Sequence, residues 1–208
     1  LMHAGGQGQG NAYVTESIAP SEVPPKGEQL EFYGGSGPFP KPRQMTEQDI
    51  TSAKQAFVDG ALNAKQSGFD GVEIHGANGY LLDQFLTDYL NQREDQYGGS
   101  LKNRLRIMLE IIEEVRKEVG EEFIIGIRIS QIKVADPDHK WAGGEDDASF
   151  IFSELSKTSL DYIHVTDSDA TAPAFGEGSR TLAKAARDFG SLPVIANGNL
   201  GNPEKAAK

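Results

Sequence analysis

The sequence contains no cysteine among its 208 residues. This absence excludes a disulfide framework, a thiolate metal site and an iron–sulfur cluster held within these residues, and we predict no metal site of any other kind. A chain without cysteine is typical of a reducing compartment, so we predict a cytoplasmic location.

Positive charge is scarce as well. Lysine and arginine number 20 against 31 aspartate and glutamate residues, which gives a formal net charge of −11 and a pI of about 4.8. An acidic surface repels phosphate backbones and anionic membranes, so we predict neither nucleic-acid nor membrane binding. The chain also lacks a run of about 18 apolar residues, which a bilayer-spanning helix needs. A small molecule remains as the expected ligand.

What is present is an ordinary globular composition, with 38% hydrophobic and 25% charged residues. We predict a single domain over residues 1–208. Residues 4–45 are rich in glycine, proline and serine, which predicts a long loop region. Loops of this length in compact domains usually serve a function.

Regular structure is predicted to begin at Thr46, a helix-capping residue followed by acidic side chains. That helix runs to about residue 66, and a second helix runs from Ser100 to Gly120. Strands and helices then alternate. The predicted strands lie near 71–74, 123–127, 161–165 and 192–196, with helices near 146–157, 179–188 and 202–208, and a further strand could end at His3.

This alternation predicts a parallel α/β sheet. Either a closed (β/α)8 barrel or an open doubly wound sheet fits it. No Gly-x-Gly-x-x-Gly follows a strand, which weighs against a dinucleotide-binding open sheet. Four or five strands fall short of the eight in a barrel, so we expect an incomplete barrel.

In such folds the chemistry lies beyond the carboxyl ends of the strands. The predicted strand 71–74 leads into a segment with His75, Asn78 and Tyr80. His75 and Asn78 are three residues apart, so one turn would aim both the same way. Two neutral donors suit a carbonyl oxygen that gains negative charge, and Tyr80 can donate a proton. The alternative is a polar loop around a buried histidine.

Arg128 follows the apolar run 123–127. It is either ion-paired structurally or aimed at an anionic ligand. Gly198 and Asn199 follow the last predicted strand and precede a helix, which is a natural place for a phosphate, although these residues also mark ordinary turns. His164 alternates with Tyr162 on a strand and is expected to line a barrel interior.

Several of these residues carry a resemblance to a known family. Residues 71–86, together with 91–93, 97–100 and 103–104, look like the signature of the old yellow enzymes, which belong to the NADH:flavin oxidoreductases and ene-reductases. The resemblance implies a TIM barrel of the FMN-linked oxidoreductase type. It also implies FMN as cofactor and NADH or NADPH as reductant.

The resemblance further implies a role for each candidate residue. His75 and Asn78 would hold the carbonyl oxygen of an α,β-unsaturated substrate. Tyr80 would protonate Cα after hydride from flavin N5 reaches Cβ. Arg128 would lie near flavin N1 and O2, and the remaining two candidates, Gly198 and Asn199, would hold the FMN phosphate.

The chain also departs from the family. A flavin-contacting glutamine and the first two strands would precede Leu1, and the final strand would follow Lys208. Gly6 stands where the family usually has an arginine. We therefore expect a partial barrel, about strands 3 to 7, that carries the catalytic side chains and roughly half of the flavin cradle.

Two alternatives to a flavin-dependent reductase of C=C bonds remain open. One is a non-catalytic truncated barrel that associates with another chain, such as a second copy of itself. The other is a different TIM-barrel enzyme with a phosphate-bearing ligand that uses His75. The sequence leaves the substrate, the choice between NADH and NADPH and the oligomeric state undecided.

Overall fold

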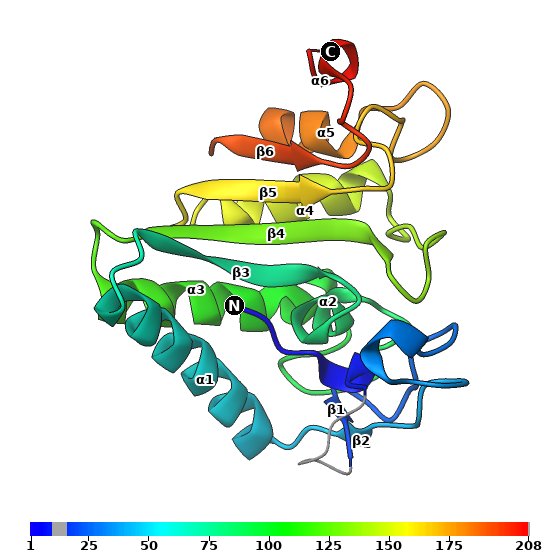
Figure 1. Cartoon of the computed structure of the whole chain (residues 1–208), viewed down its shortest axis with the longest axis vertical. Helices are drawn as coiled ribbons and strands as arrows, with labels where there is room; N and C mark the ends of the chain where they lie inside the picture. Colours follow the sequence, from blue (N-terminus) through cyan, green and yellow to red (C-terminus); the bar gives the residue numbers. More distant parts are fainter. Residues whose placement is uncertain (10–15, 208) are drawn as a thin grey trace.

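The computed structural model describes residues 1–9 and 16–207. Helices and strands alternate along most of the described chain, as the sequence predicts (Figure 1). The elements in chain order are η1 Gly5–Gln7, β1 Ile18–Ala19, η2 Glu31–Tyr33, β2 Arg43–Gln44, α1 Glu47–Gln66, β3 Gly71–Asn78, α2 Leu81–Leu86, α3 Leu101–Val119, β4 Ile124–Lys133, α4 Glu145–Leu155, β5 Tyr162–Thr166, α5 Leu182–Phe189, β6 Val194–Asn197 and α6 Pro203–Ala206.

The main sheet has four parallel strands in the order β3-β4-β5-β6. Figure 1 shows these strands in front of helices α3, α4 and α5, which cover the far face of the sheet. The side chains that point to those helices are fully buried and form the core, as Ile74, Ile127 and Ile163 do. Along β5 apolar side chains alternate with polar ones, as expected where helices cover one face of the sheet.

The first residues extend the sheet beyond β3. The terminal amino group of Leu1 donates to the carbonyl oxygen of Glu73 (2.6 Å), and the backbone N–H of His75 donates to the carbonyl oxygen of Leu1 (2.9 Å). One residue bonded to two positions on either side of Ile74 is the pairing of parallel strands. The expected strand ending at His3 is thus present only as this bonded segment, not as a separate strand.

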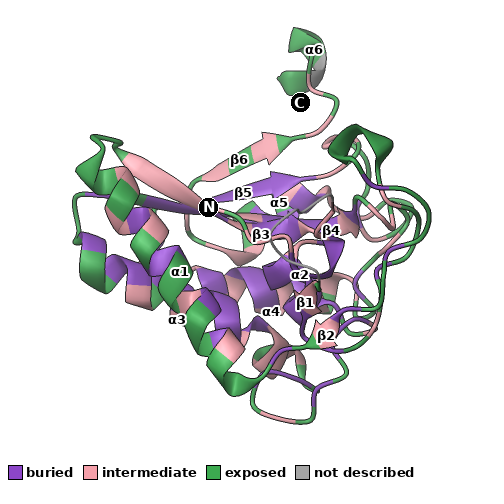
Figure 2. Cartoon of the chain, turned by 60° about the horizontal axis from the view of Figure 1, so that its bottom comes forward, coloured by how far each residue is buried: buried purple, intermediate pink, exposed green. Residues whose placement is uncertain are grey.

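The two long helices begin where the sequence predicts. The hydroxyl of Thr46 accepts from the backbone N–H of Asp49, and the Asp49 carboxylate accepts from the N–H of Thr46, a complete capping box. The hydroxyl of Ser100 accepts from the backbone N–H of Asn103 and caps α3, and Gly120 ends this helix with a positive φ of 78°. Figure 2 shows α1 and α3 with buried residues on one side and exposed residues on the other.

Strands β3 and β4 are longer than predicted, ending at Asn78 and Lys133 instead of near residues 74 and 127. The prediction ended each strand where its apolar residues give way to polar ones. The backbones of β3 and β4 stay paired beyond that point. Helix α2 was not predicted at all. Its six residues are all buried, so they carry no polar face from which a helical period could be recognised.

In the described parts of the predicted loop region, residues 4–9 and 16–45, the elements are all short. The pair β1 and β2 has two residues in each strand. Arg93 anchors the region, because its guanidinium donates to the carbonyl oxygens of Pro20 (3.0 Å) and Met45 (2.6 Å).

Among the described residues, none of the helices combines the length and the apolar character that crossing a membrane requires.

Candidate active site

Polar side chains line the face of the sheet that the helices leave uncovered. Alternation along each strand turns these residues away from the buried isoleucines. The polar residues on this face are Glu73, His75, Arg128, Tyr162, His164 and Thr166. Parallel pairing aligns His75 with Arg128 and Arg128 with His164, so three nitrogen-bearing side chains lie at one level across the sheet.

His75 lies within β3, which corrects the prediction that the strand ends before it. Its Nε2 is buried and has no hydrogen-bond partner among the described residues. Burial, followed by the positive charge of Arg128, lowers the pKa of His75 to about 4. The ring is therefore neutral near pH 7, and a neutral imidazole offers one N–H donor to a ligand.

Asn78 ends β3 in a left-handed backbone conformation, with a φ of 62°. We predicted that one turn aims His75 and Asn78 in the same direction, which assumed a loop from residue 75 onward. That assumption is wrong, because both residues belong to β3. Three residues apart on a regular strand, the two side chains would point to opposite faces. However, the pairing of β3 with β4 shifts between Gly76 and Asn78, which interrupts the alternation. A common direction for the two side chains stays a prediction.

Tyr80 lies beside His75. The centroids of their rings are 5.4 Å apart, with 52° between the ring planes. Burial, and to a smaller extent the neighbouring Tyr33, raises the pKa of Tyr80. The phenol therefore keeps its proton at neutral pH and is able to donate it. Two of the three predicted catalytic side chains are thus in contact.

Arg128 lies in the middle of β4, not at the end of a strand as predicted. Its Nε is 2.8 Å from Oε1 of Glu73 but is not aligned for a hydrogen bond, so this contact is an ion pair only. The other carboxylate oxygen of Glu73 accepts from His164 Nδ1 (2.8 Å) and from the hydroxyl of Tyr162 (3.2 Å). Burial acts to raise the pKa of Glu73, but the hydrogen bond and charge of His164 and the charge of Arg128 outweigh it and lower the pKa.

Arg128 has an N–H group that no other residue of this cluster accepts from. His164 Nδ1 also lies 3.2 Å from a terminal nitrogen of Arg128. We assign the Nδ1 proton to the bond with Glu73, because a carboxylate is the stronger acceptor. Arg128 then cannot donate to that nitrogen, and its N–H group is left for another acceptor. His164 Nε2 is buried without a partner among the described residues and, with the proton on Nδ1, is an acceptor. The spare N–H of Arg128 is therefore the donor in this cluster that fits an electron-rich ligand.

Gly198 and Asn199 follow β6 at the carboxyl ends of the strands. Both have positive φ values, 136° and 51°. A side chain at position 198 would overlap the carbonyl oxygen of Asp167, so glycine is required there. The Asn199 amide donates to a carboxylate oxygen of Asp169 (3.0 Å). The structure provides a tight turn with a carboxylate beside it, and phosphate binding by this turn stays a prediction.

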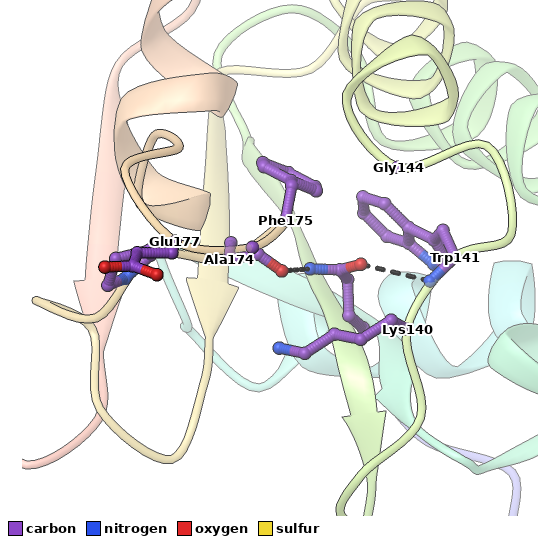
Figure 3. Close-up of a pocket in the computed structure, with 9 residues that line it drawn as sticks. Lys140, Trp141, Gly144, Ala174, Phe175 and Glu177 are labelled. Atoms are coloured by element: carbon purple, nitrogen blue, oxygen red, sulfur yellow. Dashed lines mark hydrogen bonds between the residues drawn. The ribbon is translucent and has the colours of Figure 1, made fainter.

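A separate pocket of about 590 Å³ lies between the loop after β4 and the loop between β5 and α5 (Figure 3). Gln131 joins the two loops, because its amide donates to the carbonyl oxygen of Ala174 (3.0 Å) and accepts from the backbone N–H of Trp141 (3.0 Å). None of the six predicted site residues lines this pocket. It is therefore not the predicted centre.

Two groups near the site were not predicted from the sequence. One is Glu73, whose only signal is an acidic residue within a buried strand. The other is a fully buried ion pair between Asp83 on α2 and Lys133 at the end of β4, 2.7 Å apart. A charged residue inside the apolar run Leu81–Leu86 was the available signal, since charges are almost never fully buried unless paired.

Comparison with known proteins places the chain in a family. The profile of the NADH:flavin oxidoreductase / NADH oxidase family matches residues 1–208. A probable flavin mononucleotide-dependent alkene reductase of Leishmania infantum is 36% identical over 182 residues, which cover 84% of this chain and 49% of the relative. An NADH oxidase of Thermoanaerobacter brockii is 34% identical over 217 residues, which cover 100% of this chain and 31% of the relative.

Solved structures agree with this placement. The old yellow enzyme homologue from Zymomonas mobilis superposes with a TM-score of 0.81 at 27% identity, over 95% of this chain and 55% of that one. Morphinone reductase in complex with tetrahydroNAD superposes with a TM-score of 0.72 at 32% identity, over 89% and 50% of the two chains. These neighbours are TIM barrels, so the predicted fold class is confirmed, and the chain spans about half of such a barrel.

Proposed function

The chain belongs to the NADH:flavin oxidoreductase / NADH oxidase family, and on that basis we propose that it reduces the C=C bond of α,β-unsaturated carbonyl compounds with FMN and NADH or NADPH. Alkene reduction is the activity named for the Leishmania relative. The chain spans about half of that relative's length, so the activity is proposed for the protein to which these residues belong.

The observation that carries the proposal is the pairing of His75 with Tyr80. A neutral imidazole with an unpartnered buried nitrogen lies 5.4 Å, centroid to centroid, from a phenol that keeps its proton. His75, assisted by Asn78, would hold the carbonyl oxygen of the substrate, and a donor there stabilises the negative charge that develops. Tyr80 would give its proton to Cα.

The residues around this pair fit a flavin. Arg128 has an N–H group free of His164 and lies in register with His75, so it would face the electron-rich edge of the flavin ring. Gly198 and Asn199 would lie near its phosphate. When bound, FMN supplies the hydride that reaches Cβ. The protein groups orient the substrate and deliver the proton, which is the division of labour expected in a cofactor enzyme.

Replacing Tyr80 with phenylalanine tests the proposal. Tyr80→Phe should slow alkene reduction by about 10²-fold or more, because general acid catalysis contributes that much. Flavin reduction by the nicotinamide should stay within about twofold, because this step needs no phenolic proton. Stopped-flow absorbance at the flavin band, with NADPH alone and then with an enone, separates the two half-reactions.

Two outcomes would contradict the proposed function. One is a protein that stays colourless after incubation with FMN. The other is a Tyr80→Phe variant that reduces the enone as fast as the unmodified protein does. Tyr97→Phe is a matched control, because this phenol bonds to Glu110 on α3 and not to a residue of the candidate site.

A further inference from the structure

The turn between Asn78 and Tyr80 is held in an unusual backbone conformation. Asn78 and Gly79 are consecutive left-handed residues, with φ values of 62° and 82°. Asparagine tolerates this region only with strain, which surrounding contacts must hold in place. The turn has two proposed catalytic side chains on it, so whatever fixes its backbone also fixes where those side chains lie.

Every backbone polar group of Asn78 and Gly79 is hydrogen-bonded. The N–H of Asn78 donates to the hydroxyl of Ser130 (2.8 Å), and its carbonyl oxygen accepts from the amide of Gln7 (3.2 Å). The N–H of Gly79 donates to the Asp83 carboxylate (2.7 Å). The last group, the carbonyl oxygen of Gly79, accepts from the amide of Gln84 (2.6 Å). Four side chains from three separate segments, η1, β4 and α2, therefore clamp two residues.

All of the clamping side chains are buried. Ser130, Gln7, Gln84 and Asp83 are each 4% exposed or less. A side chain at position 79 would overlap the amide of Gln7, so the turn has no room to relax on that side. The two bonds to Gly79 are buried, which strengthens them, and the carbonyl oxygen of Asn78 also accepts from the backbone N–H of Val134 (3.1 Å).

The key member of the clamp is the Asp83 carboxylate. One of its oxygens accepts from Gly79 and the other accepts from the ammonium of Lys133 (2.7 Å), which is also fully buried. A buried carboxylate without a cation would be costly, so Lys133 offsets the cost of burying Asp83 and holds its carboxylate in one orientation. Buried ion pairs add little net stability over apolar residues of the same size. The clearest effect of this pair is therefore on geometry.

We propose that the Asp83–Lys133 ion pair, with Gln84, positions the Asn78–Gly79–Tyr80 turn and thereby sets Tyr80 against His75. Asp83 and Lys133 are positioning residues, since neither is offered as a contact for substrate or flavin. The positioning role rests on the proposed function, whereas the clamping of the turn does not. Helix α2 and the end of β4 are thereby joined behind the site.

The test replaces both charges together. Asp83→Asn with Lys133→Met keeps a hydrogen-bond acceptor for Gly79 and similar volume, and leaves no buried charge alone, so the protein should fold. The matched control is Arg93→Met with Asp95→Asn, which removes an ion pair between a buried arginine and a partly exposed aspartate (2.5 Å) away from the turn.

Amide hydrogen exchange of the flavin-loaded protein is the first measurement. In the Asp83/Lys133 double variant, exchange at residues 78–80 should rise at least tenfold while exchange in α3 stays unchanged. The control pair should leave residues 78–80 as they are. Unchanged exchange at the turn in the double variant would overturn the clamp.

The second measurement is a double-mutant cycle in enone reduction. Tyr80→Phe should slow the reaction strongly in the unmodified background. In the Asp83/Lys133 double variant it should slow the reaction less than threefold, because a displaced phenol already contributes little to proton donation. Equal slowing in both backgrounds would show that the pair does not position Tyr80. If Tyr80→Phe has no effect in the unmodified protein, the proposed function fails, while the exchange experiment still decides the clamp.

Discussion

A neutral His75 has a consequence for stability that can be measured. Its pKa falls from 6.5 in an unstructured chain to about 4, first because of burial and second because of Arg128. Between these two values the unfolded chain binds a proton that the folded protein does not. Lowering the pH through this window therefore destabilises the fold, and raising it above 6.5 restores the full stability.

The size of the effect follows from linkage. At pH 5.5, a shift from 6.5 to about 4 would lower the free energy of unfolding by about 1.4 kcal/mol relative to pH 7.5. The ring is only partly buried, so solvent screening reduces this to roughly 1 kcal/mol. Both pH values lie above the pI of about 4.8, where solubility is lowest.

Urea unfolding of the unmodified protein and of His75→Asn, each at pH 7.5 and 5.5, isolates this contribution. Any contribution of the other three histidines is common to both proteins and cancels in the difference. The unmodified protein should lose roughly 1 kcal/mol more than the variant on acidification. Equal losses in both proteins, or an NMR titration of the His75 ring with its midpoint near 6.5, would refute the reasoning.

Three further outcomes follow from named contacts. Gly126→Ala should destabilise the protein by about 1–3 kcal/mol in urea unfolding, because the added methyl overlaps the ring of Tyr162; Tyr162→Ala in the same chain should recover part of the loss. Arg116→Met should cost about 2–4 kcal/mol by the same measurement, since its guanidinium donates to carbonyl oxygens at the end of α3 and before β4. Glu73→Gln should raise the flavin reduction potential by tens of millivolts in spectroelectrochemical titration, because Arg128 loses its counter-charge, and a fall in potential would contradict the proposed place of the flavin.

Local signals predicted most of the fold. Thr46 and Ser100 mark helix starts because a capping hydroxyl satisfies backbone N–H groups that no other local group can reach. Gly120 marks a helix end because it adopts a positive φ without strain. The lengths of β3 and β4 could not be predicted, since pairing with a neighbouring strand, not composition, keeps their polar ends extended.

The residue types of the candidate site could be predicted from the sequence, but the contacts between them could not. His75, Tyr80 and Arg128 stand out because polar side chains next to apolar strands need a partner. Their partners are distant in the chain: Arg128 pairs with Glu73, and the ring that lies in register with Arg128 belongs to His164. Sequence spacing carries no information about such contacts, which depend on strand order and register.

The Asp83–Lys133 pair shows why the hidden part of a site is the hardest to predict. Fifty residues separate its members, and each one alone contradicts the apolar pattern around it. The contradiction is resolved only in three dimensions, where α2 and the end of β4 meet behind a left-handed turn. A charge within a fully buried run is therefore a useful signal in itself, because burial without a partner would cost more than the fold can supply. Here the buried Asp83 indicates the turn that carries Tyr80, the proposed proton donor.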